Sequence, residues 1–172
     1  FTVSADKNTS MALAMSENKE DIQVLGSIDA EAKFQLADSG QESSILATTG
    51  RGYFVIGVLG ARQEPTNHAM RDIAAVSKEL EGWNRSMILL FKNDQDWKNF
   101  DTKEFGTLPN TITYGIDQNQ KITGMIASAM ELSNQNSLPI FIVADTFGRV
   151  VFVSQGYTIG LGEQLMGVIR KL

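Results

Sequence analysis

The alternation of short apolar runs with segments of helical period, from Tyr53 to the end of the chain, most limits the fold. The run 53–59, YFVIGVL, is hydrophobic at nearly every position, as a strand covered on both faces would be. This pattern predicts the order β-α-β-α-β-α-β-β-α and an α/β domain with parallel strands. Further strands are predicted at 86–91, 111–116, 140–145 and 149–154, the last two forming an antiparallel hairpin.

The helices are predicted from apolar residues three or four positions apart. One helix is expected to start after Pro65 and to run through to about Gly82. A short helix follows Asn93 or Asp94, and Asp117 is expected to cap the next one. The last helix spans 160–172, with an expected buried face of Leu161, Leu165, Val168 and Leu172.

The first 50 residues have a different character. They consist of short alternating pieces, FTVSA, MALAM, IQVLGSI and EAKFQ, separated by polar, turn-prone residues. A segment of this length would be only marginally stable alone. We therefore predict a domain over 44–172 and a β-rich N-terminal extension over 1–43 that packs on it.

Composition excludes several classes of function. The 172 residues include no cysteine and one histidine, His68, which removes disulfides, thiolate catalysis and zinc–cysteine sites. The formal net charge of −5 disfavours nucleic acid and anionic lipid as partners. No apolar stretch approaches the roughly 20 residues that a transmembrane helix needs, so no membrane insertion is predicted.

The chain opens with Phe1 and lacks the basic start and apolar run of a signal peptide. We expect a processed product or a domain of a longer protein.

Two stretches resemble the thioredoxin superfamily, most closely its bacterial envelope-facing thiol–disulfide oxidoreductases. They are YFVIGVLGARQEPTNHAMRDI, from Tyr53, and SLPIFIVADTFGRVVFVSQGY, from Ser137. The resemblance starts near Ser44 and implies a thioredoxin-like α/β/α sandwich. In that family an apolar strand runs into a C-x-P-C motif that opens a helix, and a cis proline precedes the fourth strand. The corresponding residues are Gln63-Glu64-Pro65-Thr66 and Pro139, which implies a cis Leu138–Pro139 bond.

Both positions that carry the family's redox chemistry are changed. Gln63 replaces the attacking cysteine and Thr66 the resolving cysteine, and neither side chain can form a mixed disulfide. Arg62 stands in place of the usual aromatic residue, and Gly57 occupies the strand position that often holds a buried carboxylate. Thiol–disulfide oxidoreductase activity is therefore excluded, and no catalytic residue, metal or cofactor is predicted.

Residues 50–75 and 152–172 also resemble a thioredoxin-like domain at the C-terminal end of transglutaminase-like proteins of the Bacteroidetes. This resemblance implies an upstream papain-like Cys-His-Asp domain. It also implies export to the periplasm or cell envelope.

The leading functional hypothesis is a non-redox module for protein interaction or scaffolding. Its partner would be a protein or peptide, with its own upstream domain as one candidate. Pro139 lacks an N–H, so the strand backbone beside it can pair with an extended peptide. The competing interpretation is that 63–66 is a relic loop in which Pro65 merely starts a helix. The predicted groove consists of Arg62, Gln63, Glu64, Pro65, Thr66, Asn67, Leu138 and Pro139.

Two alternatives use the same loop. A small enzyme would need Glu64 or His68 as acid or base and Arg62 to orient an anionic substrate, all converging on one concave site. A metal site would need Glu64, His68 and Asp72 on one helix face. Glu64 precedes Pro65 and is biased out of a helix, so the metal site is disfavoured.

Overall fold

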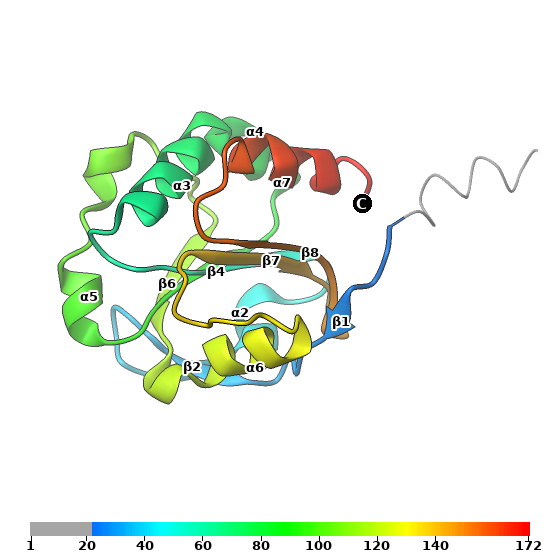
Figure 1. Cartoon of the computed structure of the whole chain (residues 1–172), viewed down its shortest axis with the longest axis horizontal. Coiled ribbons are helices and arrows are strands. Elements are labelled where there is room, and N and C mark those ends of the chain that lie inside the picture. Colours follow the sequence, from blue (N-terminus) through cyan, green and yellow to red (C-terminus); the bar gives the residue numbers. More distant parts are fainter. Residues whose placement is uncertain (1–21) are drawn as a thin grey trace, which may run out of the picture.

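The computed structural model describes residues 22–172, and within them all strands belong to one eight-stranded sheet covered by helices on both faces (Figure 1). This is the predicted α/β/α sandwich. The strand pieces predicted at FTVSA and MALAM lie outside the described residues.

Three central strands are parallel and the others are antiparallel to their neighbours. The sheet order is β1-β8-β7-β4-β5-β6-β2-β3, in which β4, β5 and β6 form the parallel part. β7 and β8 form the antiparallel hairpin that the sequence predicted, and β7 pairs with β4. The strands are β1 (Gly26–Ser27), β2 (Lys33–Leu36), β3 (Glu42–Ser44), β4 (Phe54–Val58), β5 (Met87–Phe91), β6 (Ile112–Ile116), β7 (Ile140–Ala144) and β8 (Arg149–Gln155).

The described part of the N-terminal region is β-rich and joins both edges of the sheet. β1 pairs with β8 at one edge, while the β2–β3 hairpin pairs with β6 at the other. The short helix α2 (Ile45–Thr49) then leads into β4. The division at residue 44 stays a prediction, because the sheet is continuous across it.

Two apolar layers hold the helices to the sheet. One layer joins the sheet to α3 (Glu64–Ala75), α4 (Ser77–Trp83) and α7 (Leu161–Ile169), and the opposite layer lies beneath α2 and α6 (Lys121–Ala129) (Figure 1). The side chains of β4, β5 and β7 are fully buried, which explains their continuous hydrophobic sequences. α5 (Asp94–Lys98) and two short 3₁₀ helices, η1 (Thr102–Phe105) and η2 (Gln118–Gln120), complete the described elements.

An aromatic cluster packs beneath α5. Trp97 and Phe100 contact Tyr114, with ring centroids 4.8 and 6.1 Å from it. Burial raises the pKa of Tyr114 to about 12, so its hydroxyl stays neutral at physiological pH.

Two helix predictions need correction. The helix after Pro65 is not continuous, because Val76 leaves the helical conformation (φ −109°, ψ 20°) and separates α3 from α4. The buried face of α7 includes Met166 and Ile169, whereas Val168 and Leu172 are only half-buried. Apolar residues occupy most of this helix, so spacing alone did not reveal which ones face the sheet.

No helix among residues 22–172 has the length and apolar character needed to cross a bilayer.

Candidate functional site

Three loops meet at the end of the sheet where the predicted groove lies. The Val58–Ile140 pair joins the end of β4 to the start of β7, so the loop before α3 and Pro139 share this end. The Leu138–Pro139 bond is cis, as predicted. The third loop, 156–160, is anchored there because the Gly156 N–H donates to the Pro139 carbonyl at 2.8 Å.

The β4–α3 loop turns sharply at Arg62, whose φ of 63° is in the left-handed region. Gln63 then occupies the N-cap position of α3, but its side chain makes no capping hydrogen bond. The Gln63 amide instead folds back over Gly60, where a Cβ would collide with it. Pro65 lies in the first turn of α3, where the lack of an N–H costs nothing.

Thr66 is an internal structural residue. It is fully buried, and its Oγ1 accepts a hydrogen bond from the Gly60 N–H at 3.0 Å. Thr66 was predicted to line the groove, but its side chain is turned into the protein. The residue for which the resemblance implied the second thiol position thus holds the β4–α3 loop together.

Replacing Thr66 with valine should therefore destabilise the protein while keeping the side-chain shape. The buried Gly60 N–H would lose its acceptor, at a cost of about 1–3 kcal/mol. Thr66→Ser, which retains the hydroxyl, should lose less, and chemical denaturation would measure both variants. A valine variant as stable as the unchanged protein, with the loss confined to serine, would mean that the methyl group, rather than the hydrogen bond, matters here.

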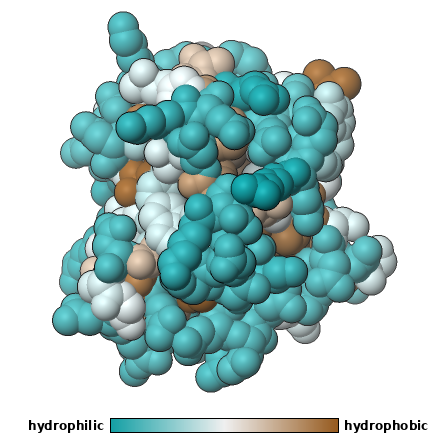
Figure 2. Space-filling view, turned by 90° about the vertical axis from the view of Figure 1, so that its left-hand side faces the viewer, coloured by the Kyte–Doolittle hydropathy of each residue, from teal (hydrophilic) through white to brown (hydrophobic). Residues whose placement is uncertain are grey.

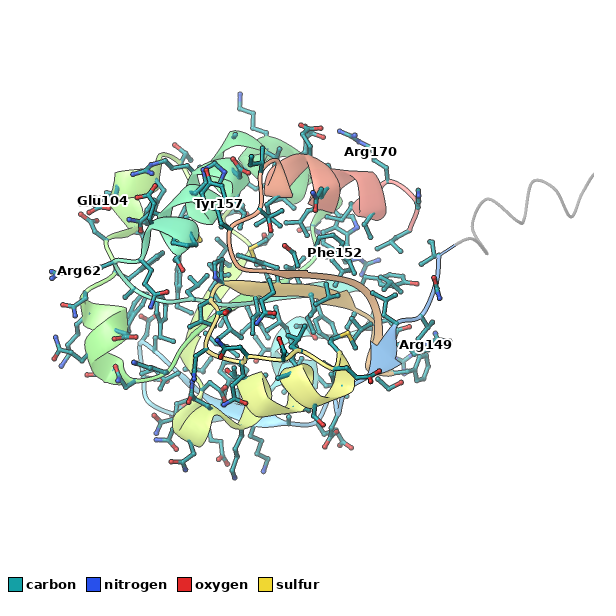
Figure 3. All side chains as sticks on the ribbon, viewed as in Figure 1. Arg62, Glu104, Arg149, Phe152, Tyr157 and Arg170 are labelled. Carbon is teal, nitrogen blue, oxygen red and sulfur yellow. The ribbon has the colours of Figure 1, made fainter. Side chains whose placement is uncertain are left out.

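His68 faces the third loop. Its ring stacks on Tyr157, with centroids 4.7 Å apart, and its Nε2 lies 3.8 Å from Asp72 Oδ2. Both of these atoms are buried without a hydrogen-bond partner. Tyr157 therefore covers α3 on the side of Pro139, which itself is buried with Leu138. Figure 3 shows Tyr157 beside α3, well away from Arg62.

The three residues of the enzyme alternative do not converge. The closest charged partner of Glu64 is the exposed Arg71, at 3.9 Å. His68 turns toward Asp72, and Arg62 lines a separate hollow. The convergence that the enzyme alternative requires is therefore absent. The metal alternative lacks Glu64 for the same reason, and residues 22–172 contain no group of three or more potential metal ligands.

The hollow beside Arg62 has a volume of about 380 Å³ and lies between α3 and the segment from α5 to η1. Figure 3 shows Arg62 and Glu104 at this end of the molecule, and Figure 2 shows that the same end is mainly hydrophilic with small hydrophobic spots. Neither Leu138 nor Pro139 lines this hollow, so the groove between them and Arg62 stays a prediction. The lining residues are Arg62, Asn67, Asn99, Phe100, Asp101, Glu104 and Phe105.

Two features of this end were not predicted from the sequence. The segment 99–105 carries no motif, and only the packing of Phe100 and Phe105 brings its polar residues opposite Arg62. Tyr157 and Ile159 are 56% and 78% exposed. Gly156 and Gly160 lie on either side of this segment, and such closely spaced glycines are the sequence signal that could have indicated an exposed loop.

No protein-family model and no curated protein matches the sequence. Solved structures do match over most of the chain. The alkyl-peroxide-reducing bacterioferritin comigratory protein of Xanthomonas campestris aligns with a TM-score of 0.62 at 11% identity, over 86% of this chain and 98% of its own. A SCO1/SenC family lipoprotein from Bacillus anthracis gives 0.63 at 14%, over 87% and 96%.

A secreted Mycobacterium tuberculosis disulfide oxidoreductase homologous to E. coli DsbE gives a TM-score of 0.60 at 13% identity, over 83% and 97%. At these identities the likeness establishes the fold alone. The chain has a thioredoxin-like fold, and it contains no cysteine.

Proposed function

We propose that this chain is a non-redox thioredoxin-fold module that serves as a protein-interaction or scaffolding domain. The observation that carries the proposal is the state of the two thiol positions. The Thr66 side chain is buried and accepts a hydrogen bond from the Gly60 N–H, and the Gln63 amide lies over the same glycine. Thr66 thus stabilises the loop, and the thioredoxin-like framework around the two residues is intact.

The contact surface in this proposal is the Arg62–Asn67 loop together with the hollow beside it. Arg62 and the Asn67 amide face Asp101 and Glu104 across that hollow, which supplies donors and acceptors on rigid elements. On the other side, the Leu138 N–H and C=O have no backbone partner within the described residues. A strand-like peptide could use this backbone if the Tyr157 loop moved aside.

The partner in this proposal is a protein segment, with an upstream transglutaminase-like domain as the first candidate. The resemblance of 50–75 and 152–172 to domains of such proteins supports this context. Exported neighbours, such as the secreted mycobacterial protein and the lipoprotein, favour the periplasm or cell envelope. Tethering would raise the effective concentration, so even a weak contact would suffice.

The redox part of the proposal predicts no catalysis of insulin reduction by dithiothreitol. A mixed disulfide requires a thiolate, and the chain has none. The rate of insulin precipitation should equal the rate without protein, with a cysteine-containing thioredoxin as the positive control. Turnover above this background would overturn the non-redox assignment.

The interaction part can be tested by titrating isotope-labelled protein with the polypeptide encoded directly upstream of Phe1. Amide shifts should concentrate at residues 62–67 and 99–105. Arg62→Ala should weaken the association several-fold, while Lys78→Ala, which removes an exposed cation on α4, should not. Shifts confined to the outer helices, with 62–67 silent, would mean that the loop is a relic.

A further inference from the structure

The Leu138–Pro139 side of the predicted groove is closed by a loop. Both residues are buried, and neither lines the hollow described above. The Tyr157 loop, residues 156–160, starts beside Pro139, because the Gly156 N–H donates to the Pro139 carbonyl, and it reaches α3, because the Tyr157 ring stacks on His68. In Figure 1 this loop rises from the end of β8 to α7 beside α3. It therefore crosses between the two sides of the groove.

Both ends of the Tyr157 loop are anchored, but the residues between the anchors are weakly held. The near anchor is the Gly156–Pro139 hydrogen bond, at 2.8 Å. The far anchor is Gly162 of α7, which lies so close to the Asp72 carbonyl of α3 that a Cβ would collide with it. Between the anchors, residues 157–160 donate no backbone hydrogen bond within the described part of the chain. A segment with so few hydrogen bonds opens at low cost.

A glycine stands at each end of the Tyr157 loop. Gly156 and Gly160 have φ values of 74° and 75°, and a Cβ at either position would meet no atom within 4 Å. Glycine changes its backbone angles without steric cost, so these two residues are suited to act as hinges. The side-chain hydrogen bond between Thr158 and Ser154, at 2.9 Å, ties the loop to β8 and not to α3. The stack of Tyr157 on His68 is thus the contact that closes the loop against α3.

The closing contact also carries a cost. His68 Nε2 and Asp72 Oδ2 are 3.8 Å apart, and both atoms are buried without a hydrogen-bond partner among residues 22–172. A buried polar atom without a partner has lost its hydrogen bonds to water and gained none in return. Movement of the Tyr157 ring away from His68 would let water reach the imidazole again. This cost offsets the gain from stacking and favours release of the ring.

We propose that the Tyr157 loop is a lid, and that a partner segment enters the Leu138–Pro139 side of the groove only after Tyr157 leaves His68. This inference rests on the proposed function, because it assigns a regulation to the same contact surface. In the closed form the loop occupies the path between Pro139 and α3. In the open form the Leu138 N–H and C=O, which have no backbone partner within residues 22–172, can pair with an extended segment.

The lid has a measurable consequence for affinity. When only the open form binds, the apparent dissociation constant equals that of the open form divided by the fraction of molecules that are open. Removing the Tyr157 ring removes the stack that closes the loop, so the open fraction rises. Ile159 is the matched position in the same loop, because its side chain is 78% exposed and projects into solvent. Substitution of Ile159 by alanine should therefore leave the open fraction unchanged.

Nuclear magnetic resonance of the full chain without any partner tests the lid itself. His68 is the only histidine of the sequence, so its ring signals are unambiguous. Relaxation dispersion should show the His68 ring and the amides of 157–160 exchanging between two forms at one common rate, on the microsecond-to-millisecond scale of lid motions. Tyr157→Ala should abolish this exchange, because the closed form is lost, whereas Ile159→Ala should preserve it. A loop that shows no exchange would overturn the proposal.

Titration with the polypeptide encoded directly upstream of Phe1 tests the effect of the lid on binding. Tyr157→Ala should bind this polypeptide several-fold more tightly than the unchanged protein, because no lid has to open. Tyr157→Phe, which keeps the ring, and Ile159→Ala should bind it as the unchanged protein does. Equal affinity for all four proteins would overturn the lid and leave the proposed function standing. If none of them binds, the proposed function fails for this partner, and the relaxation measurement decides the lid by itself.

Discussion

Replacing Gly148 with alanine is expected to lower the free energy of unfolding by about 3 kcal/mol, because two separate costs add at this position. Gly148 has a φ of +81°, which a residue with a Cβ adopts only with strain. A Cβ there would also collide with the Ile28 carbonyl oxygen, a backbone atom. Thermal or chemical denaturation of the two proteins would measure the difference.

The second cost arises because Gly148 joins the β7–β8 turn to the strand beside it. The Ile28 N–H donates to the Gly148 carbonyl at 2.8 Å, and the Gly148 N–H donates to the Asp145 backbone carbonyl, also at 2.8 Å. Moving Ile28 away would break the first bond and pull a buried side chain from the core. The substitution should therefore loosen β1 as well as the turn.

Gly156→Ala is the matched control for Gly148→Ala. Gly156 has a similar φ of +74°, but a Cβ there would meet nothing within 4 Å. Only the conformational cost of about 1–2 kcal/mol should remain. If both variants lose the same stability, the close approach of Ile28 is not what requires glycine at 148.

The strands were predictable from sequence because burial on both faces leaves a continuous hydrophobic signal. β4, β5 and β7 are each within two residues of the predicted ranges. The cis bond before Pro139 followed from the family resemblance. The break between α3 and α4 at Val76 was less predictable, because no glycine or proline marks it and both helices pack against the distant α7.

The candidate site was predictable only in part, because its composition depends on contacts between distant segments. The sequence located the β4–α3 loop, but it could not show that Thr66 turns inward to Gly60 or that Tyr157 stacks on His68. Both contacts are set by where β8 ends and how α3 lies on the sheet. The polar composition of the β4–α3 loop therefore did not reveal which of its side chains face solvent.

The second large effect is expected at Asp117, where alanine should remove about 3 kcal/mol of stability. Asp117 is 1% exposed at the end of β6, four residues before α6 begins. Its Oδ1 accepts from the Ile122 N–H at 2.9 Å. Its Oδ2 accepts from the Thr123 N–H at 2.7 Å and the Thr123 hydroxyl at 2.6 Å. Alanine would leave all three donors without an acceptor in a buried site.

The capping role that the sequence predicted for Asp117 is thus confirmed, although it acts across the intervening η2. Asp117→Asn keeps one acceptor oxygen and should lose less stability than alanine, since one face of the cap survives. The surface control is Asp101→Ala, because Asp101 caps η1 through the Lys103 N–H at 3.0 Å but remains exposed to water. Water can replace that acceptor, so the loss there should stay near or below about 1 kcal/mol. A loss at Asp101 as large as that at Asp117 would show that capping alone, without burial, accounts for the effect.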